Sequence, residues 1–71
     1  MAKSNREVLA RNILKYRAAL DLNQAELARL VGVSQKTISM LEHAKARHNP
    51  TLALLDSIAE ALKIDTYRLL Q

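Results

Sequence analysis

The sequence predicts an all-α fold of five short helices. Apolar residues recur at steps of three and four along the chain, the period of helices that bury one face. The alternation of apolar and polar residues that is typical of strands is absent, and glycine and proline occur once each. At 71 residues, roughly 60% of the unfolded surface can be buried on folding. We therefore expect residues 1–71 to form one domain, with residues 1–5 as a disordered arm.

The first helix is expected to run from about Asn5 to Leu20. Ser4 and Glu7 have the S-x-x-E spacing of a capping box, in which side chains and backbone N–H groups at a helix start satisfy one another. The inward stripe of this helix consists of Leu9, Ile13, Tyr16 and Leu20.

The single glycine marks the end of the second helix. Residues 24–31 read QAELARLV, and Asn23 precedes them as a cap with Glu26 three positions later. Gly32 follows directly, where a helix commonly ends in the left-handed conformation that glycine adopts at little cost. The sequence therefore predicts a sharp turn after residue 31.

The remaining helices also begin at recognisable caps. Ser34 caps a third helix that extends to about His43, and a basic loop follows. Asn49 is expected to cap a fourth helix with Pro50 at its first position, because the N–H that proline lacks has no partner there. Asp65 caps a final turn or two. The buried stripe of the fourth helix is Leu52, Leu55, Ile58, Ala59 and Leu62.

Positive charge is concentrated in the first two thirds of the chain. The net charge is +4, with nine Lys or Arg against four Asp or Glu in residues 1–47 and two against three in residues 48–71. Such a distribution favours a polyanionic partner, because each phosphate contact releases counterions; an ordinary solvated surface is the alternative. The absence of Phe and Trp gives little support to stacking on single-stranded bases.

Other classes of protein are disfavoured by what the sequence lacks. Without cysteine there is neither a disulfide nor a thiolate metal site. The longest apolar run, residues 52–55, is far too short to span a bilayer, and no signal-peptide core follows residues 1–6. We expect a cytoplasmic protein with no membrane partner.

Catalysis and metal binding are also not expected. Ser39, Glu42 and His43 do not make a nucleophilic site, because no oxyanion loop or pocket-forming sequence accompanies them. His43 and His48 lack the further ligands that a metal needs. The sequence therefore predicts no enzyme activity, cofactor, metal or small-molecule substrate.

The third helix has one apolar and one polar face. At about 100° per residue, Ile38 and Leu41 point inward with Glu42 beside them. The opposite face is centred on Lys36, Met40 and His43, flanked by Thr37 and Ser39, with Gln35 in the first turn. This face carries amide, ammonium and hydroxyl groups but no carboxylate. A major groove lined by phosphates suits such a face, because Gln pairs with adenine, Lys with guanine, and a Met methyl with a thymine methyl.

Two short helices joined at a glycine indicate a helix-turn-helix. Ala28 is small where the helices approach, Gly32 allows the turn, and Ile38 fills the angle between them. The segment from Leu22 to Glu42, LNQAELARLVGVSQKTISMLE, resembles the phage repressor and Cro (Xre-type) family of helix-turn-helix DNA-binding proteins. With NPTLALLDSIAEALKI matching the family's fourth helix, the resemblance extends over about residues 9–70 and implies a five-helix lambda-repressor-like domain.

The resemblance also implies DNA-contacting residues. Those expected to contact bases are Gln35, Lys36, Thr37 and Met40; those expected to contact phosphates are Gln24, Ser34, Ser39, His43, Lys45, Arg47 and Asn49. The alternatives are a first-turn polar residue for Gln24, a solvated helix face for Gln35 and Lys36, and an exposed apolar residue for Met40.

Other positions carry structural expectations. Arg17 and Glu42 match an ion pair by which the family joins its first helix to the end of the third. The loop after residue 43 departs from the family pattern, with Ala44 where a glycine is common and a residue or two of extra length. Lys3 and Arg6 belong either to an arm directed toward DNA or to a disordered terminus.

These implications define a functional expectation. The chain is expected to be a sequence-specific transcriptional repressor that binds a palindromic operator in double-stranded DNA as a homodimer. Tyr67 and Leu70 are the candidate dimer contacts, unless they cover the core of their own chain. The alternative is a protein-binding module on the same fold, an antitoxin or an adaptor, whose partner is a toxin or a co-regulator.

Overall fold

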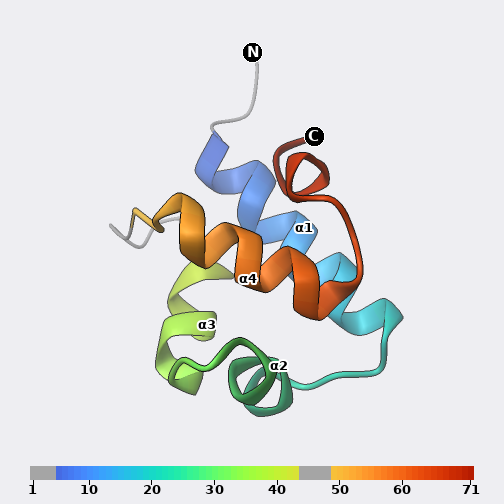
Figure 1. Cartoon of the computed structure of the whole chain (residues 1–71), viewed down its shortest axis with the longest axis vertical. Helices are drawn as coiled ribbons and strands as arrows, with labels where there is room; N and C mark the ends of the chain where they lie inside the picture. Colours follow the sequence, from blue (N-terminus) through green and yellow to red (C-terminus); the bar gives the residue numbers. More distant parts are fainter. Residues whose placement is uncertain (1–4, 44–48) are drawn as a thin grey trace.

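Four α-helices and a C-terminal 3₁₀ helix form the part of the chain that the computed structural model describes, residues 5–43 and 49–71 (Figure 1). They are α1 (Asn5–Ala19), α2 (Gln24–Val31), α3 (Gln35–Leu41), α4 (Leu52–Leu62) and η1 (Thr66–Leu70). The α1 helix packs against α3 and η1, and α4 packs against α2 and η1. The prediction of five α-helices is thus wrong in its last element. The TYRLL segment forms only a short 3₁₀ helix, at whose N-cap Asp65 makes no side-chain hydrogen bond.

A single core joins all five elements. Each contributes one fully buried large side chain: Ile13, Leu27, Ile38, Ile58 and Leu69. One buried polar residue, Asn12, fastens the C-terminal element to the first helix, because its Nδ2 donates to the carbonyl oxygens of Arg68 at 3.2 Å and Leu69 at 2.9 Å. The short η1 is therefore held in place by the burial of Leu69 and by the two hydrogen bonds from Asn12. Without these bonds the buried amide of Asn12 would have no partner for its N–H groups, which is unfavourable.

The first helix ends one residue earlier than predicted. Its last residue is Ala19, and Asp21 turns the chain with φ 61°. Leu20 therefore leaves the inward stripe and is exposed, contrary to the prediction, whereas Ile13 is buried and Tyr16 packs at the edge of the core. The predicted capping box at residue 4 lies outside the described residues.

The turn between α2 and α3 has the predicted caps. Asn23 Oδ1 accepts from the N–H of Glu26 at 2.7 Å while the Glu26 carboxylate accepts from the N–H of Asn23 at 2.9 Å. Gly32 is left-handed, with φ 87°, and a Cβ there would meet no atom within 4 Å. Glycine is therefore favoured by its backbone conformation and not by lack of space. The αL residue turns the chain so that Ser34 can start a new helix.

The fourth helix begins later than predicted. Thr51 is its N-cap, with Oγ1 accepting from the N–H of Leu54 at 3.1 Å, so Pro50 precedes the cap instead of opening the helix. Asn49, the predicted cap, instead accepts a hydrogen bond from Arg6. The shift leaves Leu52 outside the buried stripe with 69% exposure, contrary to the prediction, and brings Leu54 against the core.

Candidate nucleic-acid interface

The α3 helix is held against α2 by its inward residues. Ile38 and Leu41 are buried, and Ala28 is buried where α2 approaches. Ser34 Oγ accepts from the N–H of Thr37 at 3.2 Å and shares a hydrogen bond with Thr37 Oγ1 at 3.0 Å, which fixes the first turn. The helix ends at Leu41 with Glu42 as C-cap, shorter than the predicted extension to about His43.

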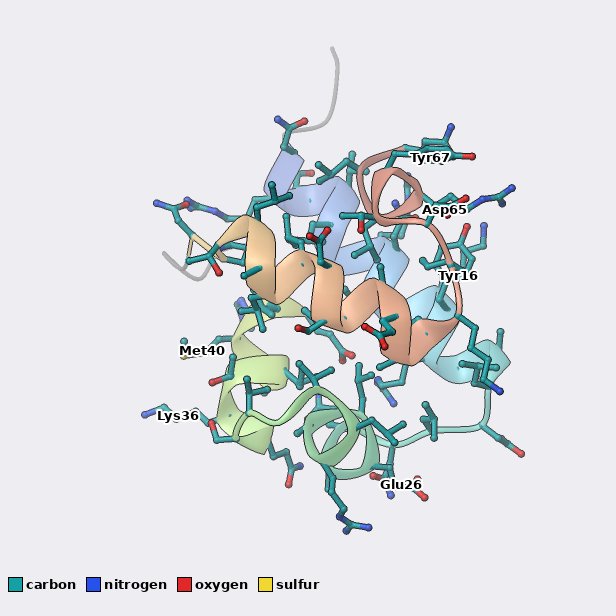
Figure 2. The ribbon with its side chains drawn as sticks, in the orientation of Figure 1. Tyr16, Glu26, Lys36, Met40, Asp65 and Tyr67 are labelled. Carbon is teal, nitrogen blue, oxygen red and sulfur yellow. The ribbon has the colours of Figure 1, made fainter. Side chains whose placement is uncertain are left out.

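The opposite side of α3 faces outward. Gln35, Lys36 and Ser39 are exposed, and Thr37 and Met40 are half-buried. Figure 2 shows Lys36 and Met40 on the same side of α3, both pointing away from the other helices. Helix α3 contains no acidic residue. The arrangement presents hydrogen-bond donors and one positive charge on a helix short and exposed enough to enter a groove.

The carboxylate that follows α3 directly in the chain, that of Glu42, is turned inward. Glu42 Oε2 accepts from Arg17 Nε at 2.6 Å and Oε1 accepts from Arg17 Nη2 at 3.0 Å, with the two side chains 6% and 14% exposed respectively. The structure thus contains the ion pair that the resemblance implies. Because the Arg17 guanidinium offsets its charge, this carboxylate repels a nearby phosphate less than an unpaired carboxylate would.

Gln24 also forms a hydrogen bond with Glu42. Its Nε2 donates to Glu42 Oε1 at 2.9 Å, a bond that the sequence reasoning missed. The reason is that Gln24 opens α2 and Glu42 closes α3, so no helical periodicity relates them. The helix-turn-helix pattern would have been the signal, since it brings these two helix ends together.

The expected arm and loop are placed only in part. Asn5 and Arg6 belong to α1, which begins at Asn5 as expected for the first helix, and residues 1–4 of the expected arm lie outside the described residues. Arg6 Nη2 donates to Asn49 Oδ1 at 2.8 Å, a contact that ties α1 to the segment before α4. Lys45 and Arg47 lie outside the described residues, as do Lys3, Ala44 and His48. His43 is exposed next to α3.

The C-terminal element leaves two apolar side chains uncovered. Tyr67 and Leu70 are 58% and 45% exposed, whereas their neighbour Leu69 fills the core. Figure 2 shows Tyr67 at the end of the molecule far from Lys36. Arg68 places a positive charge beside this surface, and hydrogen bonds to the Tyr16 side chain and then to Tyr67 raise the pKa of its guanidinium, which is protonated with or without this shift.

Neither a metal-binding cluster nor a membrane-spanning helix occurs in the described residues. Residues 5–43 and 49–71 contain no group of three or more His, Cys, Asp or Glu side chains that could hold a metal ion. No helix over residues 5–43 or 49–71 is long and apolar enough to cross a membrane.

The α2–α3 unit with its outward polar face defines a helix-turn-helix DNA-binding protein. A helix-turn-helix family model matches residues 13–69, and the chain belongs to this family, in its Xre/Cro-like form. The family is one of transcription regulators that bind double-stranded DNA and is not a class of enzymes.

Relatives in archaea share the sequence pattern. The chain is 48% identical over 50 residues to an uncharacterized HTH-type transcriptional regulator of Methanothermobacter thermautotrophicus, a match that covers 70% of each chain. A second protein of the same description, from Archaeoglobus fulgidus, is 45% identical over 47 residues, which are 66% of this chain and 63% of that protein.

Solved structures share the fold. A hypothetical transcription factor NHTF from Neisseria has a TM-score of 0.89 and 34% identity over 96% of this chain and 76% of its own. The clp gene regulator ClgR from C. glutamicum has a TM-score of 0.84 and 29% identity, and the match covers 97% of this chain and 87% of that protein. The restriction-modification controller protein C.AhdI from Aeromonas hydrophila has a TM-score of 0.85 and 24% identity, and the match covers 94% of this chain and 98% of that protein. At this identity the match shows a similar fold.

Proposed function

We propose that the chain is a transcriptional repressor that binds a palindromic operator as a homodimer, with α3 of each protomer in the major groove. The observation that carries the proposal is the outward face of α3, which is rich in donors and has no carboxylate. A dimer bound to an operator excludes other proteins from the same stretch of DNA, so repression is the expected effect.

The proposed base contacts follow from side-chain chemistry. The exposed amide of Gln35 matches adenine N6 and N7, and the ammonium of Lys36 matches guanine O6 and N7. Met40 is half-buried and lacks a strong donor, so a thymine methyl is its natural contact. Thr37, whose hydroxyl is engaged with Ser34, contributes its methyl group at the edge of the same face.

The proposed phosphate contacts surround this face. Of the described residues they are Gln24, Ser34, Ser39, His43 and Asn49, to which the resemblance adds Lys45 and Arg47 from outside the described ranges. Asn49 Oδ1 already accepts from Arg6, so the pair would approach a phosphate through its N–H groups. These contacts set the position of α3, whereas the base contacts set specificity.

The proposed dimer uses the exposed C-terminal side chains. Tyr67 and Leu70 lie on η1, and Tyr67 is far from Lys36 (Figure 2), so a two-fold contact through η1 leaves the outward face of α3 uncovered in both protomers. The two α3 helices should then enter major grooves about 34 Å apart.

Selection of bound sequences from a random duplex pool tests the proposal as a whole. We expect a palindrome to be recovered at both low and moderate salt, and sedimentation to show two chains for each duplex of that sequence. Recovery of an asymmetric half-site, with one chain on each duplex, would contradict the dimer. Recovery of no sequence would contradict specific DNA binding.

Replacing Lys36 by alanine should weaken and broaden recognition. We expect a loss of about 1 to 3 kcal/mol on the selected palindrome and relaxed preference at one base pair of each half-site. Lys15→Ala, which removes the same charge from an exposed position on α1, is the matched control and should leave the base preference unchanged. Competition binding with single-base variants measures both. Equal losses on specific and random DNA would place Lys36 on a phosphate instead.

One observation favours a second candidate function, the docking of a protein partner such as a toxin or a co-regulator. A groove of about 580 Å³ lies between α2, α4 and the turn after α1, lined mainly by Leu20, Leu22, Leu30, Val31 and Ala61. It does not include α3, so its occupation is compatible with DNA binding. A chain that binds no duplex in the selection experiment would make docking the better proposal.

A further inference from the structure

The Glu42 carboxylate lies at a junction of three segments. It belongs to the end of α3, and it accepts hydrogen bonds from α1 through Arg17 and from the first residue of α2 through Gln24. Its side chain is 6% exposed, so these donors take the place of water. A group satisfied in this way has a fixed position relative to all three helices.

Arg17 holds this carboxylate rigidly. Besides the two bonds to Glu42, its Nη1 donates to the carbonyl oxygen of Leu22 at 2.8 Å. The guanidinium plane is therefore anchored to the α1–α2 turn on one edge and to Glu42 on the other. Neither partner can rotate without breaking a charge-assisted bond.

The Gln24 carboxamide acquires a defined orientation from this arrangement. An ionised carboxylate only accepts hydrogen bonds, so the nitrogen end of the amide must face Glu42 and the oxygen end must face away. The amide nitrogen carries two hydrogens, and they diverge by about 120° in the plane of the group. When one hydrogen donates to Glu42, the other is directed elsewhere.

We propose that Glu42 is a positioning residue for DNA binding, which holds the Gln24 amide so that its second N–H donates to a backbone phosphate. The inference rests on the proposed function and adds a mechanism to it. Gln24 opens α2, where the helix dipole also favours an anion. Because the side chain is already ordered by Glu42 in the unbound protein, less of its conformational entropy remains to be lost on binding.

Removal of the Gln24 donor should weaken binding to every duplex alike. Gln24→Met keeps the length of the side chain without an amide, and we expect roughly fivefold weaker binding to both the selected palindrome and a random 20-base-pair duplex. The dependence of affinity on salt should not change, because no charge is removed. Gln71→Met, at the exposed last residue, is the matched control and should bind as wild type does.

The role of Glu42 is tested by combining substitutions. In a Glu42→Gln background the orientation of the Gln24 amide is no longer imposed by a carboxylate, so Gln24→Met should then cost less than about twofold. The same roughly fivefold loss in both backgrounds would show that Gln24 acts without Glu42 and would overturn the proposal.

A measurement on the wild-type chain covers the case in which Glu42→Gln does not fold. The two side-chain amide protons of Gln24 give separate NMR signals, and addition of the random duplex at low salt should shift one while the proton bonded to Glu42 keeps its position. Binding with neither signal moved, or with both moved, would overturn this inference alone. Failure of the wild type to bind any duplex would overturn the proposed function as well.

Discussion

Replacing Glu42 by alanine is expected to lower the free energy of unfolding by about 3 to 5 kcal/mol. The substitution leaves the guanidinium of Arg17, whose side chain is 14% exposed, without its carboxylate partner, and it removes the acceptor of the Gln24 amide. A buried charge without a partner costs more than the pair contributes while intact, because it has lost both water and counter-charge.

That loss is large for a chain of this size. At roughly 0.05 to 0.15 kcal/mol per residue, a domain of this length typically has a free energy of unfolding of roughly 4 to 11 kcal/mol. Urea denaturation followed by circular dichroism measures the change, with Glu60→Ala on the exposed side of α4 as the matched control, expected within about 0.5 kcal/mol of wild type. Unchanged stability of Glu42→Ala would show that the ion pair contributes nothing.

Replacing Ile38 by alanine should cost about 2 to 5 kcal/mol. The side chain is fully buried in the angle between α2 and α3, against a core to which every element contributes, and its loss leaves a cavity that the tightly turned α2–α3 unit can fill only in part. We also expect weaker binding to the DNA sequence recovered by selection, because the same side chain sets the angle of α3.

The control for Ile38→Ala is a leucine on the surface. Leu52→Ala removes a side chain of equal volume from the exposed start of α4, and it should change stability by less than about 0.5 kcal/mol. A loss below about 1 kcal/mol for Ile38→Ala would mean that the structure closes around the missing side chain.

Local signals in the sequence predicted the helix-turn-helix well. The caps at Asn23 and Ser34 depend on residues three positions away, and the turn at Gly32 depends on the carbonyl four positions back, so their hydrogen bonds can be inferred from spacing alone. Periodicity failed at the helix ends. Leu20 and Leu52 continue an apolar pattern beyond the point where Asp21 turns the chain and Thr51 starts a helix.

Contacts between distant segments could not be predicted from pattern. The resemblance to a known family supplied the pairing of Arg17 with Glu42, but the bonds of Gln24 to Glu42, of Arg6 to Asn49 and of Asn12 to η1 depend on how the helices pack. Of these contacts, only that of Asn12 has a signal in the sequence. Asn12 is a polar residue three positions after Leu9 on the inward face of α1, where an apolar residue is the norm.

The core, to which each element contributes one large buried side chain, affects how fast the protein is degraded in a cell. No element can detach without exposing its share of that core, so unfolding should be all-or-none and no intermediate should keep α3 folded while another helix is lost. A duplex that binds only the folded chain then withdraws molecules from the unfolded population in proportion to its occupancy. Proteases that cleave the unfolded chain should spare the DNA-bound protein and remove the unbound one, so that turnover raises the fraction of the protein that is bound to DNA.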